Sequence, residues 1–343
     1  MARTRMDWTG DVAAGNWLRQ RIDGDGPTWG ASMHAWVPRG FEAYARIFHP
    51  ADRDRPVGRP WPPLPYAHHQ REWAAFQSAA PQIDIERVSW AAAADAFGTT
   101  MHPQAQWHAV VGPREIEGED GPRDAAGWRY SDPPAGELAS DLVAAVTQTL
   151  LAHTTTPADG FVALWEGWGG LVGGLGFGPS RVLLAAAGDA GDPSADRHAN
   201  FLATSVRDRF NDVFRKPTWQ RGILDDEVSR GPRLRLPHRD HVLFRGDLAE
   251  LADPEWPWQV PWRDAALVAR GGAASALDPN AVSPSLVWPA DHAWVMATDV
   301  DADSTVIAGS SAAVRAVCAD PRLEAVRIDE GTDLSWGADE VNA

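Results

Sequence analysis

The sequence predicts an α+β fold, in which mixed or antiparallel sheets are flanked by amphipathic helices. Helices with an apolar stripe and several short strands follow one another in an irregular order, without the alternation typical of a doubly wound sheet. The composition is that of a folded globular protein, since 44% of the residues are hydrophobic and 23% are charged. The 18 tryptophans among 343 residues provide a large ring surface for the core or for binding.

The N-terminal third of the chain shows both helical and strand periodicity. Apolar side chains recur along one helix face from Trp8 to Leu18, which predicts a helix over 7–21. Alternating side chains predict a strand that stops at Pro50. The elements expected after the first helix are a strand over 40–49, a proline-rich loop over 51–66, an alanine-rich helix over 88–97 and a strand over 106–111.

The C-terminal half contains the strongest helical patterns. Leucine or valine recurs every four residues from Leu138 to Leu150, so a helix is expected over 134–153. A second apolar stripe predicts a helix over 195–214. The other expected elements are strands over 161–165 and 181–186 that form a hairpin across a glycine-rich connection, strands over 241–244, 293–298, 305–308 and 323–328, and a helix over 310–319.

One segment poor in apolar residues predicts a domain boundary. From Gly112 to Gly136 the chain is rich in glycine, proline and charged residues, which is typical of a linker or a long surface loop. We therefore expect an N-terminal α+β region over 1–115, a linker or surface loop over 116–136 and a C-terminal α+β domain over 137–343.

Charge and cysteine content limit the function classes. The formal net charge of −16 repels phosphate backbones at long range, so we expect no nucleic-acid partner. Cys318 is the single cysteine, which excludes an intrachain disulfide. The basic residues near Met1 precede no apolar segment typical of a signal peptide, and the glycine-rich stretch 167–180 is too short to span a membrane. These observations predict a cytoplasmic protein without a membrane partner.

Local motifs indicate neither a cofactor nor a metal. The glycine-rich segment 165–178 matches neither the dinucleotide fingerprint nor the phosphate-binding loop, so a flexible connection is its expected role. Asp299, Asp301 and Asp303 resemble the start of an EF-hand loop, but the sixth position lacks glycine and Ser310 replaces the final glutamate. A capped turn between two strands is the expected role of this segment, with a weak cation site as the alternative.

A histidine-containing segment is the main candidate for catalysis. Acid, base or metal-binding groups beside arginines would suit a hydrolase acting on an anionic or sugar-like small molecule. The same basic segment, 230–245, could instead neutralise the acidic segment 298–343 within the fold, and the sequence leaves both alternatives open. The candidate catalytic residues are His238, Asp240 and His241, and the candidate anion-binding residues are Arg233, Arg235 and Arg239.

Tryptophans in proline-rich loops are the leading candidates for a binding surface. Tryptophan is enriched at interface hot spots, and a neighbouring proline lowers the entropy lost on binding. We therefore expect a cytosolic binding or interaction protein without chemistry of its own, whose partner is another protein or a small anionic ligand. Tryptophans in periodic elements, such as Trp90 and Trp107, are expected in the core. The expected contact residues are Trp256, Trp258, Trp262, Trp288 and Trp294.

Two segments carry a resemblance to a known family. They are 285–310, which begins Ser-Leu-Val-Trp-Pro-Ala-Asp-His, and 37–44, which reads Val-Pro-Arg-Gly-Phe-Glu-Ala-Tyr. The chain resembles an uncharacterised family of tryptophan-rich cytosolic proteins of actinobacteria. Because that family has no known activity, the resemblance implies no catalytic residue.

Overall fold

The computed structural model divides the chain into two compact units. Unit 1 comprises 1–166 and 232–343, and unit 2 comprises 167–231. Unit 1 contains a nine-stranded sheet and a three-stranded sheet, and unit 2 contains a two-stranded one. The described residues are those outside 1–4, 25–31, 113–120, 177–216, 264–280 and 343.

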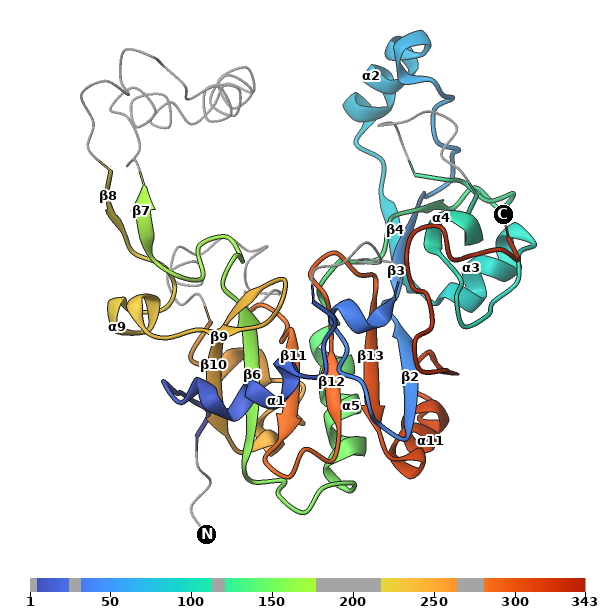
Figure 1. Cartoon of the computed structure of the whole chain (residues 1–343). Helices are drawn as coiled ribbons and strands as arrows, with labels where there is room; N and C mark the ends of the chain where they lie inside the picture. The colour runs from blue at the N-terminus through green and yellow to red at the C-terminus, as the bar shows by residue number, and fades with distance from the viewer. Residues whose placement is uncertain (1–4, 25–31, 113–120, 177–216, 264–280, 343) are drawn as a thin grey trace. The chain divides into compact units, whose positions relative to one another are not determined.

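Neighbouring strands in the large sheet of unit 1 are antiparallel (Figure 1). The predicted α+β class is confirmed. Strand β2 lies between two strands from the C-terminal end of the chain, so distant parts of the sequence are neighbours in the sheet. The order is β1 (Asp7–Trp8), β10 (Asp240–Gly246), β6 (Gly160–Trp165), β11 (Leu286–Pro289), β12 (Val295–Ala297), β13 (Ser304–Gly309), β2 (Ala43–Phe48) and β14 (Ala325–Ile328), with β9 (Leu234–Arg235) paired to β10.

Two amphipathic helices pack on the large sheet and on each other (Figure 1). They are α5 (Ser140–Leu151) and α11 (Ser311–Ala319), and α11 also contacts β2, β13 and β14. The Ser310 hydroxyl accepts a hydrogen bond from the Ala313 N–H at 3.2 Å and so caps the first turn of α11. The apolar stripe of each helix is thereby buried against its neighbours.

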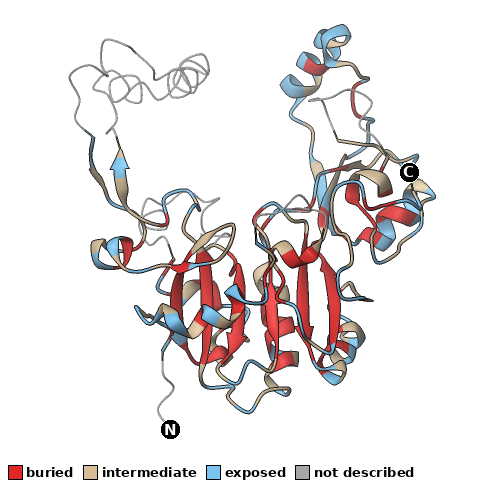
Figure 2. Ribbon diagram, viewed as in Figure 1, coloured by how far each residue is buried: buried red, intermediate tan, exposed pale blue. Residues whose placement is uncertain are grey.

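The buried residues of unit 1 follow the strands of the large sheet (Figure 2). Short N-terminal elements add to this core, since α1 (Asn16–Arg19) and the 3-10 helix η2 (Met33–Ala35) contribute Leu18 and Met33 to the cluster around Trp288. Burying a side chain of this size contributes about 1.5–3 kcal/mol. Helices of one turn are not stable alone, so these contacts keep them in place.

A smaller three-stranded sheet follows β2 along the chain. Two helices pack beside it and form a second core with Trp90, Trp107 and Tyr130. The indole N–H of Trp90 donates to the His49 carbonyl at 2.7 Å, which satisfies the polar atom of a fully buried ring. The elements are β4 (Ile83–Val88), β3 (Ala51–Pro56) and β5 (Arg129–Tyr130) in sheet order, with α2 (Gln70–Ala79), α3 (Trp90–Phe97) and α4 (Trp107–Val110).

Unit 2 contains a strand pair and a short helix in its described part. Strand β7 (Gly174–Gly176) pairs with β8 (Thr218–Gln220). Helix α9 (Asp226–Arg230) is capped by Asp225, whose Oδ1 accepts from the Val228 N–H at 2.8 Å. The glycine-rich segment expected to be a flexible connection therefore supplies a short strand.

The strongly periodic segments fold as expected. Two further segments, the strand 181–186 and the helix 195–214, lie outside the described residues. The predicted hairpin between the strands at 161–165 and 181–186 is nevertheless wrong. The first of these strands is β6, and its two edges pair with β10 and β11. The confirmed elements are the strands expected at 40–49, 161–165, 241–244, 293–298, 305–308 and 323–328, and the helices expected at 88–97, 134–153 and 310–319.

The N-terminal segment departs from the predicted helix. The range 7–21 is divided into β1, a 3-10 turn η1 (Val12–Gly15) and α1. Gly15 is buried, and a Cβ there would come within 2.6 Å of the Leu234 side chain. The apolar pattern could not reveal this approach, because Leu234 is distant in sequence.

Two other local predictions are wrong. The strand expected over 106–111 is helix α4, because Trp107 and Val110 lie three residues apart and enter the same core. The loop expected over 51–66 contains β3, whose alternating charges show no apolar period.

The predicted boundary at 116–136 does not separate the compact units. Strand β2, from the expected region 1–115, pairs along its length with β13 of the expected domain 137–343. The observed division falls instead at 167–231. A polar, proline-rich composition marks a surface segment, and such a segment need not end a domain.

Candidate functional site

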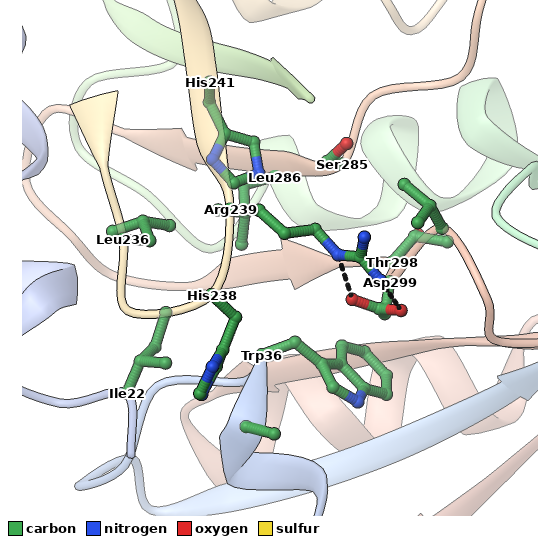
Figure 3. A pocket seen from close by; sticks show the side chains of 12 residues that line it. Ile22, Trp36, Leu236, His238, Arg239, His241, Ser285, Leu286, Thr298 and Asp299 are labelled. Atoms are coloured by element: carbon green, nitrogen blue, oxygen red, sulfur yellow. Dashed lines mark hydrogen bonds and ion pairs between the residues drawn. The ribbon is translucent and has the colours of Figure 1, made fainter. Parts of the chain in front are cut away.

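Two adjoining cavities in unit 1 form the candidate site. The larger one, the outer cleft, has a volume of about 310 Å³, which is within the size range of small-molecule sites. The smaller one, the inner pocket, has a volume of about 30 Å³ (Figure 3). The residues that line both cavities are Ala35, Trp36, His238, Arg239 and Asp299.

The turn between β12 and β13 supplies the carboxylates of the outer cleft. Asp299, Asp301 and Asp303 all line it. The side chain of Asp299, the first residue of the turn, stabilises it, since Asp299 Oδ1 accepts a hydrogen bond from the Asp301 N–H at 3.0 Å. The Ala302 N–H donates to the Asp299 carbonyl, also at 3.0 Å. The predicted turn is therefore confirmed, and it brings three carboxylates to one cavity.

Arg239 binds two of these carboxylates. Its guanidinium donates to both oxygens of Asp299, at 3.0 and 3.1 Å (Figure 3). It also donates to Asp301 Oδ2 at 2.6 Å. Burial lowers the pKa of Arg239, but the hydrogen bonds and charges of the two carboxylates outweigh burial, so that the pKa is raised. At this position the basic segment neutralises the acidic segment, which is one of the two alternatives that the sequence left open.

Arg46, on β2, is the charged partner of Asp303. Its guanidinium lies 3.4 Å from the Asp303 carboxylate and donates at 2.7 Å to the Ala105 carbonyl and at 3.0 Å to the Ser304 hydroxyl. Arg46 is 1% exposed. Burial raises the pKa of Asp303, and the neighbouring guanidinium offsets that rise only in part.

Two indole rings form apolar walls of the outer cleft. Trp336 is 75% exposed and is stacked on His108, with ring centroids 3.7 Å apart and planes 4° apart. Trp36 is half-buried and borders both cavities. The segment that carries Trp336 is held by Asp339, whose Oδ1 accepts from His102 Nε2 at 2.8 Å. An exposed indole that is held in position offers a preformed surface to a ligand.

Polar groups on β10 and next to β11 and β12 line the inner pocket (Figure 3). His241 is 5% exposed, and its Nδ1 is buried without a hydrogen-bond partner among the described residues. Burial lowers the pKa of His241 to about 4, so the imidazole is neutral at pH 7. Ser285 and Thr298 also line the pocket.

A chain of buried hydrogen bonds fixes the direction of the Thr298 hydroxyl. Burial lowers the pKa of His49 to about 4, so its ring is neutral, and its Nδ1–H donates to the Pro134 carbonyl at 2.8 Å. His49 Nε2 must then accept from the Thr305 hydroxyl at 2.9 Å. The Thr305 oxygen accepts in turn from Thr298 at 2.7 Å. The Thr298 hydroxyl therefore donates its hydrogen bond within the protein and is directed at Thr305.

The predicted catalytic residues are only partly brought together. His238 and His241 line the inner pocket, and His238 Nε2 donates to the Asp23 carbonyl at 2.9 Å. Asp240 lies 3.9 Å from Arg235 and borders neither of the two cavities in the described part of the chain. Adjacent strand residues point to opposite faces of the sheet, so Asp240 and His241 do not meet. The structure therefore does not bring the three predicted catalytic residues to one cavity.

The predicted anion-binding arginines do not form one site. Arg233 Nε donates to Glu166 Oε2 at 2.9 Å. The Arg235 side chain is 77% exposed beside Asp240. Arg239 lines both cavities but is held by carboxylates.

Four of the five tryptophans predicted to form a contact surface lie in the interior. The short 3-10 helix η5 (Trp256–Trp258) turns the first ring inward, and its indole N–H donates to the Ser140 carbonyl at 3.1 Å. Trp258 is half-buried, with the Arg263 guanidinium 4.4 Å from its ring centroid. The predicted contact surface is therefore wrong, because most of these rings are buried in the interior of unit 1. The four rings with at most 1% exposure are Trp256, Trp262, Trp288 and Trp294.

Of the residues that line the outer cleft, only His238 and Arg239 were predicted as site residues. Asp301 and Asp303 were predicted as parts of a turn, with a weak cation site as the alternative, and Gln106, which also lines the cleft, was predicted as part of a strand. Trp336 carried the clearest available signal, since a tryptophan in a polar terminal segment has few apolar neighbours to pack on.

A comparison with protein-family models, curated proteins and solved structures finds no match to this chain. The geometry of the cleft therefore carries the functional interpretation. In the described ranges, no helix is long and apolar enough to cross a membrane. The same ranges contain no group of three or more His, Cys, Asp or Glu side chains suited to a metal ion.

Proposed function

We propose that this protein binds a small organic molecule and that the outer cleft is its binding site. The observation that carries the proposal is the exposed indole of Trp336 beside the carboxylates of Asp301 and Asp303, in a cavity of about 310 Å³. Apolar walls with a few polar groups at fixed positions are typical of small-molecule sites. The cleft has both.

The construction of the cleft supports a site formed before the ligand arrives. Trp336 is stacked on His108, and Asp299 and Asp301 are held by Arg239. Groups that are already ordered lose little entropy when a ligand binds, so a larger part of the contact energy contributes to affinity.

Binding is favoured over the other functions expected from the sequence. The tryptophans expected to contact a partner protein are mostly in the core, and Asp240 lies apart from the histidines that a hydrolase would use with it. We therefore retain the hypothesis of a cytosolic binding protein. Its proposed binding site is now the outer cleft, and its proposed partner is a small molecule.

A screen of small polar metabolites by ligand-observed NMR tests this function. Affinities of the hits are then measured by calorimetry for the wild type and for Trp336→Ala. We expect about tenfold weaker binding to the variant, because it loses a large apolar contact. Its fold should be unchanged, since the ring is 75% exposed.

Leu175→Ala is the matched control, because Leu175 is an exposed apolar residue of the same exposed fraction, 75%, in unit 2. It should keep the wild-type affinity. If no compound binds, or if all hits bind Trp336→Ala as tightly as the wild type, the proposed function is wrong.

A further inference from the structure

We propose that the ligand of the outer cleft is an organic cation, a small aliphatic amine whose ammonium group is held by the carboxylates of the 299–303 turn. This inference rests on the proposed binding function and names its ligand class. Charge, ring chemistry and hydrogen-bond direction each support it.

The charges at the cleft favour a cation. Asp299, Asp301 and Asp303 outnumber Arg239 and the buried Arg46, which leaves a formal charge of −1. Each guanidinium is already hydrogen-bonded to carboxylate, hydroxyl or carbonyl oxygens, so an anion would have to displace one of them. A cation displaces none, and the net charge of −16 attracts it at long range.

The exposed groups of the cleft suit both parts of an aliphatic amine. The Asp301 side chain is 83% exposed, so its carboxylate is accessible to an ammonium group. Trp36 and Trp336 present indole rings in the same cavity. Indole is the aromatic ring that attracts cations most strongly, and its face also packs well against methylene groups.

The inner pocket supplies an independent indication, because it contains a buried hydrogen-bond acceptor. His241 is buried and neutral, and its Nδ1 has no partner in the described part of the chain. A neutral imidazole has one acceptor nitrogen. A pocket of about 30 Å³ admits a single N–H or O–H group at the far end of the amine.

Three probes with the same five-carbon chain separate charge from shape. They are cadaverine, 1,5-pentanediol and glutarate, which are cationic, neutral and anionic at pH 7. Calorimetry at low ionic strength should give about tenfold tighter binding for cadaverine than for the diol, and the weakest binding for glutarate.

Asp301→Asn removes the charge of the most accessible carboxylate and keeps the size of the side chain. We expect this variant to bind cadaverine about tenfold more weakly and the diol within about twofold of the wild type. Asp95→Asn, at an exposed position of α3, is the matched control and should keep the wild-type affinity for cadaverine. Thermal unfolding of each variant checks that it is folded.

The possible failures are distinguishable. Equal affinities for cadaverine and the diol, or tighter binding of glutarate, would overturn the inference that the ligand is a cation. Either result would leave the proposed binding function intact. No binding of cadaverine at about 10 mM would also overturn it, while the binding function is decided by the metabolite screen. Cadaverine binding that Asp301→Asn and Trp336→Ala both leave unchanged would place the cation elsewhere and overturn the inference.

Discussion

At the scale of single residues, Arg46 connects the large sheet to the site. It lies on β2 and donates hydrogen bonds to Ala105 and Ser304, and its guanidinium is 4.5 Å from the centroid of the Phe48 ring. Burial lowers the pKa of Arg46 and raises that of Asp303, so each charge is tolerated because of the other. Arg46 therefore positions the carboxylate and the start of β13 together.

Replacing Arg46 with alanine should destabilise the protein by about 1.5–3 kcal/mol, because the buried guanidinium and its hydrogen bonds to the Ser304 hydroxyl and the Ala105 carbonyl would be lost. The matched control is Arg39→Ala. That arginine pairs with Asp23 where the two side chains are 45% and 40% exposed, so a loss below about 1 kcal/mol is expected. Urea unfolding measures both values, and equal losses would contradict this account.

At the scale of elements, the 299–303 turn is held from outside by Gly136. The Gly136 N–H donates to the Ala302 carbonyl at 2.8 Å. Gly136 has a φ of +74°, and a Cβ there would lie 2.5 Å from the Val300 carbonyl oxygen. Only glycine fits this position, so the carboxylates of the cleft depend on a residue outside the turn.

Gly136→Ala should therefore affect both stability and binding. The positive φ alone costs about 1–2 kcal/mol, and the clash with the turn adds about 1–3 kcal/mol. Gly40→Ala separates the two contributions, because Gly40 has a φ of +82° and a Cβ added there would meet nothing within 4 Å. We expect only Gly136→Ala to weaken cadaverine binding as well; equal effects of the two variants on unfolding and binding would count against the clash.

Elements with a strong period were predictable, and the site was not. The four-residue apolar spacing of α5 and the Ser310 cap of α11 are local signals that burial then satisfies. Trp36, Arg239, Asp301 and Trp336 meet in the cleft because of strand order and long-range contacts, which leave no local pattern. For the same reason the rings of the proline-rich loops were assigned to the surface, although distant segments cover them.

At the scale of the whole molecule, buried neutral histidines link folding to pH. His49 is 0% exposed and His241 is 5% exposed, and burial lowers the pKa of each from 6.5 to about 4. The pKa values of His34, His108 and His292 are also lowered by burial. Below pH 6.5 the unfolded chain takes up protons that the folded chain does not bind, so stability falls as the pH falls.

The free energy of unfolding should decrease between pH 6.5 and 4, by about 1.4 kcal/mol per pH unit from His241 alone. His241→Gln cannot take up a proton in this range, so its profile should be less steep by about that amount. Urea unfolding at several pH values compares the two slopes, and parallel profiles would show that His241 is not the titrating group. Raised carboxyl pKa values, such as that of Asp303, oppose the trend equally in both proteins.

Unit 1 should fold without unit 2. Trp165 pairs with His241, which pairs on its other side with Leu234, so the two ends of unit 1 at the insertion lie about two strand spacings, roughly 10 Å, apart. Replacing 167–231 with a glycine-serine linker of about six residues should preserve one cooperative urea transition. Loss of cooperativity in the shortened chain would contradict the independence of unit 1.

The position of β2 between β13 and β14 also determines when β2 can pair with its neighbours during biosynthesis. All six residues of β2 are buried in the finished sheet, yet the strands that cover its two edges come much later in the sequence, at 304–309 and 325–328. Until residues 304–309 are translated, the nascent chain therefore exposes an apolar strand with both hydrogen-bonding edges unpaired, which is a site for aggregation and for chaperones. A ribosome stalled before residue 304 carries a chain in which β2 has neither of its partner strands.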